Sequence, residues 1–126
     1  MSQVIVHAHP DMFMSPPLVE IGGGWLGVAE KVIQDLKSLH PGLRVGAMFK
    51  DSQGMLQVDV AFEAGDYDSD ILDRVLEITS QARLYSAWAC HVDGKPGWLV
   101  DAPDGRRPLC PACQRRRGLK GMRHAA

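Results

Sequence analysis

The sequence lacks any long apolar run and has few cysteines. No stretch approaches the roughly 20 consecutive apolar residues that a membrane-spanning helix needs, so we expect no membrane contact. The start, Met1-Ser2-Gln3, lacks a basic region followed by an apolar one, so no signal peptide is expected and a cytoplasmic location is favoured. Only Cys90, Cys110 and Cys113 are present, and an odd, clustered set argues against a disulfide framework. Metal binding or redox chemistry is the better interpretation.

Length and charge narrow the class of protein further. The 126 residues suffice for one ordinary domain but not for a cofactor domain plus a substrate domain. The formal net charge is −1, yet it is unevenly distributed: no acidic residue follows Asp104, and Arg74 is the single basic residue between Asp59 and Glu77. Such asymmetry can steer partners of opposite sign toward each region.

Two charged sets are therefore candidates for partner binding. The acidic set is Asp59, Glu63, Asp66, Asp68, Asp70 and Asp73. It is either a surface that docks on a basic groove or simply the solvated face of a strand and a helix. The basic set is Arg106, Arg107, Arg115, Arg116 and Arg117. It is either a phosphate-binding surface, whose affinity would fall with salt, or a solubilising chain end.

Hydrophobic periodicity predicts an α+β core with the order helix, β-hairpin, helix. Apolar residues that recur at three and four positions predict helices over about 25–39 and 70–85. Alternation on both sides of Asp51-Ser52-Gln53-Gly54 predicts a hairpin of strands at 43–50 and 55–62. The residues expected on the buried face of the first strand are Leu43, Val45, Ala47 and Phe49. A lone hairpin is marginal, so the helices must cover that face.

The two ends of the chain are expected to differ from this core. Near the N-terminus, Val4-Ile5-Val6 indicates a short strand, whereas Pro10, Pro16 and Pro17 discourage regular structure. We therefore divide the chain into an α+β core with an irregular N-terminal segment at 1–86, a zinc-ribbon-like module at 87–117 and a basic tail at 118–126.

The module is predicted from the spacing Cys90-x2-Asp93-x16-Cys110-x2-Cys113. Two knuckles, each with two ligands separated by two residues, let four ligands turn onto one Zn²⁺ ion. The fourth ligand is Asp93 or His91, since a carboxylate and an imidazole can both bind zinc. Gly94 follows where a tight knuckle turn can use a positive φ. The alternatives are a metal-free remnant packed as a small core and a redox Cys-x-x-Cys pair.

Several segments carry a family resemblance. They are Pro17-Leu18-Val19-Glu20-Ile21-Gly22, Gly24-Trp25-Leu26, Leu43-Arg44-Val45, Cys90 with Gly94-Lys95-Pro96-Gly97, and Leu109-Cys110-Pro111-Ala112-Cys113. In order, over roughly residues 16–117, these segments resemble small, largely uncharacterised phage and prophage proteins that carry a Cys-x-x-Cys-Gly-x-Pro-Gly knuckle and a Leu-Cys-x-x-Cys knuckle. This chain departs from the group at Asp93, which stands in place of the second cysteine. The resemblance implies a mobile-element origin and no established activity.

Two motifs match known sites only in part. The segment Ala8-His9-Pro10-Asp11 is similar to the metal motif of zinc-dependent N-acetylglucosaminyl deacetylases, but Met12-Phe13 stand where those enzymes need a second acidic pair. Gly22, Gly24 and Gly27 match the dinucleotide-binding fingerprint G-x-G-x-x-G. This motif indicates dinucleotide binding only when it lies inside a βαβ unit. The predicted helix-then-hairpin context argues against such a unit.

Three functions follow as hypotheses. The first is a non-enzymatic binding protein of a phage or prophage that uses the acidic set, such as an anti-CRISPR-like inhibitor of a host or defence nucleoprotein complex in the bacterial cytoplasm. The alternative is a nucleic-acid-binding zinc ribbon that uses the basic set. The third is an enzyme with zinc held by the three cysteines and an open fourth position. The zinc deaminase signature also needs His-x-Glu, which the sequence lacks, so we name no catalytic residue.

Overall fold

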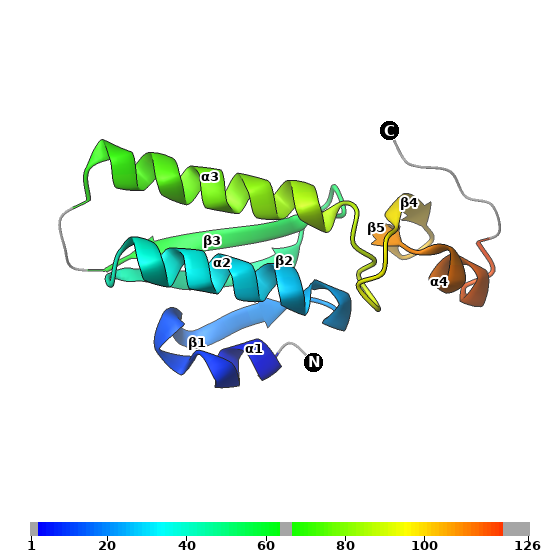
Figure 1. Ribbon diagram of the computed structural model, residues 1–126. Helices are drawn as coiled ribbons and strands as arrows, with labels where there is room; N and C mark the ends of the chain where they lie inside the picture. The colour runs from blue at the N-terminus through cyan, green and yellow to red at the C-terminus, as the bar shows by residue number, and fades with distance from the viewer. Residues whose placement is uncertain (1–2, 64–66, 120–126) are drawn as a thin grey trace.

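The computed structural model describes residues 3–63 and 67–119 (Figure 1). Its helices and strands are α1 (Gln3–Ala8), β1 (Phe13–Glu20), α2 (Leu26–Leu39), β2 (Leu43–Lys50), β3 (Leu56–Phe62), α3 (Ser69–Ser86), β4 (Trp98–Ala102), β5 (Gly105–Leu109) and α4 (Pro111–Arg116). The single helical turns η1 (Pro10–Met12) and η2 (Gly23–Trp25) precede β1 and α2. The predicted α+β class and the order helix, hairpin, helix are confirmed.

A three-stranded sheet in the order β1-β2-β3 carries both long helices on one face (Figure 1). Strand β2 pairs with β3 in the antiparallel sense, as predicted, and with β1 in the parallel sense. The core between sheet and helices is dominated by fully buried side chains: Trp25, Val32, Ile33, Leu36, Leu43, Val45 and Met48. Helix α3 begins where expected, because the Asp68 carboxylate accepts a hydrogen bond from the Ile71 backbone N–H at 2.9 Å. No helix in the described ranges is long and apolar enough to cross a membrane.

The N-terminal segment is regular rather than irregular. Residues Val4-Ile5-Val6 lie in α1, not in a strand, and this helix buries Ile5 in the main core. Strand β1 contains both Pro16 and Pro17. The prolines are tolerated because β1 is an edge strand whose register shifts between Phe13 and Leu18, so the missing N–H groups cost no ladder hydrogen bond.

The buried face of β2 changes partway along the strand. Leu43 and Val45 enter the core as predicted, but Met48 then takes the inward position that alternation assigned to Ala47 and Phe49. An irregularity between Val45 and Ala47 is the cause, because an extra residue in one strand of an antiparallel pair reverses the faces beyond it. Ala47 is still buried, while Phe49 is half-buried.

Candidate metal centre

The C-terminal module is a β-hairpin followed by one short helix. Strands β4 and β5 pair in the antiparallel sense, and α4 begins directly after β5 at Cys110. The module lies beyond the end of α3, at one end of the sheet (Figure 1). It has a small buried cluster of its own, which consists of Cys90, Val100, Leu109, Cys110 and Cys113. The three sulfurs thus form a large part of a core that is otherwise very small.

Three cysteines and one aspartate converge in this module. One ligand atom from each of Cys90, Asp93, Cys110 and Cys113 lies within 4.8 Å of all the others. The Asp93 Oδ2 atom is 3.3 Å from the Cys110 sulfur and 3.4 Å from the Cys113 sulfur. Four donors at about 2.0–2.3 Å from a tetrahedral zinc ion would stand roughly 3.5–4 Å apart. The donor set therefore has the size and chemistry to bind a metal ion.

Local backbone geometry turns each knuckle inward. In the first, the Gly94 N–H donates to the Cys90 carbonyl at 2.9 Å, and the Cys90 N–H donates to the Lys95 carbonyl at 2.8 Å. Gly94 has φ +77°, which confirms the predicted use of a left-handed conformation in this turn. In the second, Cys110 caps α4, and its sulfur accepts from the Cys113 N–H at 3.4 Å.

His91 is not part of the ligand group, so only one of the two proposed fourth ligands lies with the sulfurs. Its Nε2 atom accepts a hydrogen bond from the Gly22 N–H at 2.7 Å, and its ring lies 4.3 Å from the Trp25 ring. Burial, assisted by the nearby cations Arg107 and Lys50, lowers the pKa of His91 to about 4 and keeps the ring neutral. His91 holds the module against the core instead.

The charges in the site suit a cation. A hydrogen bond from the Lys95 backbone N–H is the main reason that the pKa of Asp93 falls to about 2, so this carboxylate is ionised at neutral pH. Burial raises the pKa of the Cys113 thiol to about 12 in the metal-free protein, although Arg116 lies 2.9 Å from its sulfur and opposes the shift. A metal ion would displace the thiol protons, which is how metal binding and folding become coupled.

The first knuckle packs on the glycine-rich turn before α2. The Gly24 N–H donates to the His91 carbonyl at 3.1 Å, and the Trp25 indole Nε1–H donates to the Ala89 carbonyl at 3.0 Å. A Cβ atom on Gly24 would collide with the Cys90 carbonyl oxygen, and one on Gly22 would collide with that of His91. These two glycines are required because the knuckle backbone lies directly against theirs.

This packing bears on the dinucleotide motif. Contrary to the expectation from sequence, Gly22, Gly24 and Gly27 do lie in a βαβ unit, since β1 and β2 are parallel and α2 connects them. A phosphate-binding turn of this type needs free backbone N–H groups at the helix start. Here the N–H groups of Gly22 and Gly24 both donate to His91, so the turn serves as a docking point for the module.

The two charged sets have different surroundings. Within the acidic set, Asp59, Glu63, Asp68, Asp70 and Asp73 are exposed, and Asp66 lies outside the described residues. Glu63 is 3.7 Å from Arg44, and Asp68 caps α3. The arginines that form ion pairs inside the module are Arg106 with Asp101, Arg107 with Asp104, Arg116 with Asp93 and Arg117 with Asp104. Arg115 is exposed on α4.

Sequence reasoning missed one polar anchor in the N-terminal segment. His9, which belongs to the segment predicted to be irregular, is buried; its Nε2 atom lies 2.7 Å from a Glu30 carboxylate oxygen, and its Nδ1 atom lies 2.7 Å from Lys37 Nζ. It ties the segment before β1 to α2. No local sequence pattern indicates this role, because the two partners of His9 are 21 and 28 residues away in the sequence.

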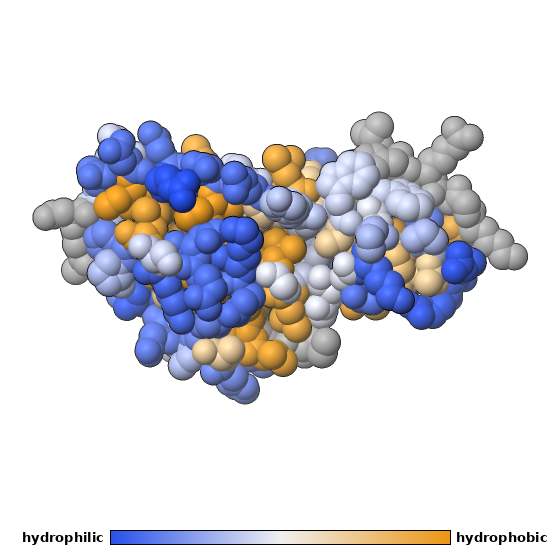
Figure 2. All heavy atoms as spheres, viewed as in Figure 1, coloured by the Kyte–Doolittle hydropathy of each residue, from blue (hydrophilic) through white to orange (hydrophobic). Residues whose placement is uncertain are grey.

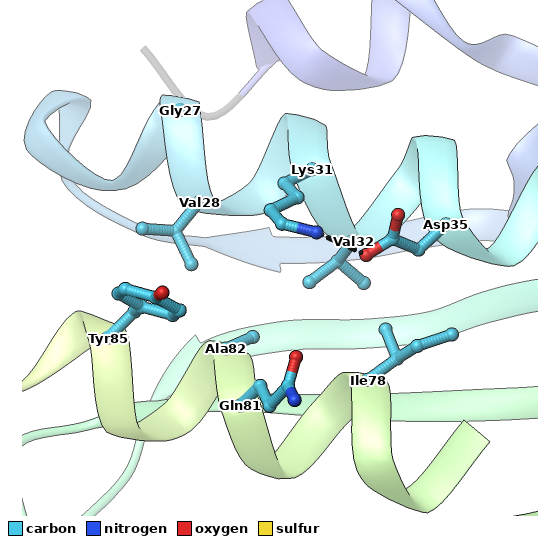
Figure 3. A pocket seen from close by; sticks show the side chains of 9 residues that line it. All are labelled: Gly27, Val28, Lys31, Val32, Asp35, Ile78, Gln81, Ala82 and Tyr85. Carbon is cyan, nitrogen blue, oxygen red and sulfur yellow. Dashed lines mark hydrogen bonds and ion pairs between the residues drawn. The ribbon is translucent and has the colours of Figure 1, made fainter. Parts of the chain in front are cut away.

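A second feature without a sequence signal is a groove between α2 and α3 (Figure 3). Apolar side chains appear at the surface between these helices in Figure 2, with Val28, Val32 and Ile78 among those that line the groove. The Lys31–Asp35 ion pair lies at its rim. Its volume of about 270 Å³ is small for a ligand site, and Lys31 and Asp35 in its lining are paired with each other.

Comparison with known proteins adds no relative. No protein-family model matches the chain, and no curated protein or solved structure is significantly similar to it.

Proposed function

We propose that this chain is a non-enzymatic binding protein of a phage or prophage, which acts in the bacterial cytoplasm on a host or defence nucleoprotein complex, in the manner of an anti-CRISPR inhibitor. The contrast between the two charged sets supports this choice over a nucleic-acid-binding ribbon. Asp70 and Asp73 are exposed on the first turns of α3, available to a basic surface. The basic set, in contrast, is mostly engaged in ion pairs within its own module.

Those ion pairs matter because phosphate binding needs arginines that are free to neutralise phosphates and so displace the counterions condensed on the nucleic acid. An arginine already paired with Asp101 or Asp104 must give up that partner before it neutralises a phosphate. Surface pairs are individually weak, so they lower the phosphate affinity rather than abolish it. Nucleic-acid binding is therefore the weaker candidate, and a mobility-shift assay at low salt tests it alongside the proposal.

Zinc is the metal we propose for the centre. Three thiolates and a carboxylate form a soft, tetrahedral donor set, which suits Zn²⁺ better than Mg²⁺ or Ca²⁺. With Asp93 in the fourth position no coordination site stays open for a substrate, so the ion is structural. It would hold the two knuckles together in a module whose apolar core is very small.

The binding proposal is tested by capture of a purified defence nucleoprotein complex on the immobilised chain. The double variant Asp70→Lys/Asp73→Lys should lose capture. Asp68 is left in place, because its side chain caps α3 and its loss would unfold the helix start. The matched control, Asp11→Lys/Glu20→Lys, makes the same change in net charge at exposed sites elsewhere. Equal capture by parent and double variant would refute the acidic docking face.

The zinc proposal has its own measurement. Metal analysis of the purified chain should find zinc in equimolar amount, and Cys110→Ser should lose it together with thermal stability. Removing zinc from the parent with a chelator should also lower the melting temperature, because an ion that binds only the folded chain stabilises it. A fully folded chain that takes up no zinc would show that the cluster is a metal-free core.

A further inference from the structure

The sheet has one protected edge and one open edge. Strand β1, at one side, carries Pro16 and Pro17, and α1 packs beside it. Strand β3, at the other side, pairs only with β2 among the described residues and contains no proline. An unprotected edge strand presents a row of unpaired backbone N–H and C=O groups, to which another strand can add.

A groove runs along this open edge. It has a volume of about 500 Å³ and lies between β3 and α3. Its β3 lining includes the consecutive residues 57–60, whose side chains point to both faces of the sheet, so the groove follows the strand edge itself. The α3 lining consists of Leu72, Val75, Leu76 and Thr79, which share one helix face at spacings of three and four.

Two leucines in this groove are poorly buried. Leu72 is 46% exposed and Leu76 is 66% exposed, although both lie beside the buried Val75. Their side chains form an apolar wall next to free backbone hydrogen-bonding groups. This combination is the one used in strand addition, where the backbone supplies affinity and pockets for alternate side chains supply specificity.

Charge restricts what can occupy the groove. Asp59 lines it on β3, and the exposed Asp73 is adjacent to Leu72 on α3. Two copies of this chain paired in the antiparallel sense through the centre of β3 would bring Asp59 of each copy close to the other, and like charges across paired strands are destabilising. A segment that carries lysine or arginine would meet complementary charge instead.

We propose that the groove between β3 and α3 binds an extended basic segment of a partner protein, which adds to the edge of β3 as a further strand and seats alternate apolar side chains on Leu72 and Leu76. This inference rests on the proposed function, because it names the element that the acidic surface recognises. It differs from simple charge attraction in requiring backbone pairing along β3.

A library of random linear peptides of about ten residues, longer than a typical strand, is the probe. Selection on the purified full chain should enrich peptides in which apolar residues alternate with lysine or arginine. A synthetic copy of an enriched peptide should slow amide hydrogen exchange in residues 56–62. Leu76→Ser should weaken its binding about tenfold, the loss expected when half of a leucine side chain is no longer buried. The matched control is Leu84→Ser, which changes a 65% exposed leucine of the same helix outside the groove.

Three results of the peptide experiments would overturn the inference: no enrichment or no alternation in the selected peptides, binding that leaves exchange in β3 unchanged, or equal effects of Leu76→Ser and Leu84→Ser. Sedimentation of the free chain should show a monomer. A dimer that Leu76→Ser dissociates would assign the groove to a second copy and also overturn it. The proposed function is judged separately by the Asp70→Lys/Asp73→Lys capture experiment, which does not depend on any peptide result.

Discussion

Replacing Gly24 by alanine should separate the cysteine module from the core. The backbone of Gly24 lies against that of the first knuckle, so an added Cβ atom would overlap the Cys90 carbonyl oxygen and the Gly94 nitrogen and would come within 2.9 Å of the Asp93 nitrogen. All three are backbone atoms, which cannot move aside by a change of rotamer. The knuckle itself must therefore shift.

The expected cost follows from the contacts that the shift would break. Overpacking of a closely packed site costs about 1–3 kcal/mol. Displacing the knuckle also weakens the hydrogen bonds from the Gly24 and Gly22 N–H groups to His91, each worth about 1 kcal/mol. We expect a total loss of roughly 3 kcal/mol, or about 10 °C in melting temperature for a chain of this size.

Gly27→Ala is the matched control. A Cβ atom on Gly27 would meet nothing within 4 Å beyond its chain neighbours and its own helix backbone, and the residue lies in the first turn of α2. Alanine there should be neutral or should stabilise the helix by up to about 1 kcal/mol. Urea unfolding followed by circular dichroism measures both variants, and zinc affinity provides a second readout, because movement of Asp93 should weaken metal binding in Gly24→Ala only.

The outcome that refutes the reasoning is equal stability of the two alanine variants. Agreement within about 0.5 kcal/mol, the range of an ordinary surface substitution, would mean that the knuckle does not pack on Gly24. A large loss of stability in Gly24→Ala with unchanged zinc affinity would show that the clash is relieved elsewhere and that the metal centre does not depend on the glycine turn.

Three further predictions test other parts of the structure. Asp93→Cys should complete a four-thiolate set and bind zinc more tightly than the parent in competition with a chelator, whereas Asp93→Ala should bind zinc more weakly. Equal zinc affinities of the three chains would mean that Asp93 is not a ligand. His91 has its pKa lowered from 6.5 to about 4, so its contribution to stability is full above pH 6.5 and is lost as the pH falls toward 4, because the unfolded chain takes up a proton that the folded chain does not; melting temperatures of metal-free chains should fall less over this window in His91→Gln, and parallel curves would contradict the assignment. Ser86→Ala should cost about 1–3 kcal/mol in urea unfolding, because the buried Ser86 Oγ accepts the Leu56 N–H at 2.8 Å and alanine leaves that donor unpaired; a loss below about 0.5 kcal/mol would mean that the donor finds another acceptor.

The parts of the fold that were predicted correctly are those with strong local patterns. Helix α2 and helix α3 have apolar residues at spacings of three and four, and the hairpin has two alternating runs around a turn. Strand β1 was missed because Pro16 and Pro17 normally break a strand, and only its position at the sheet edge makes them acceptable. The switch of faces at Met48 was missed because a β-bulge leaves no reliable mark in the alternation.

For the candidate site, cysteine spacing was sufficient to group Cys90 with Cys110 and Cys113, since knuckle geometry is local and depends on few residues. It did not decide between Asp93 and His91, because both are close to Cys90 in sequence and both can bind zinc. The choice depends on which side chain faces the second knuckle, and His91 instead faces Gly22 and Trp25.

By itself, the sequence determined the α+β class, the two long helices and the hairpin, because each is encoded by residues close together or at a regular period, and the spacing of the two knuckles predicted the grouping of the three sulfurs. Tertiary structure alone decided that β1 lies parallel to β2, that the glycine turn docks the cysteine module, and that Leu72 and Leu76 stay exposed beside the open edge of β3. Those features depend on contacts between residues far apart in the chain, and a local sequence pattern does not specify which distant segment will pack against it.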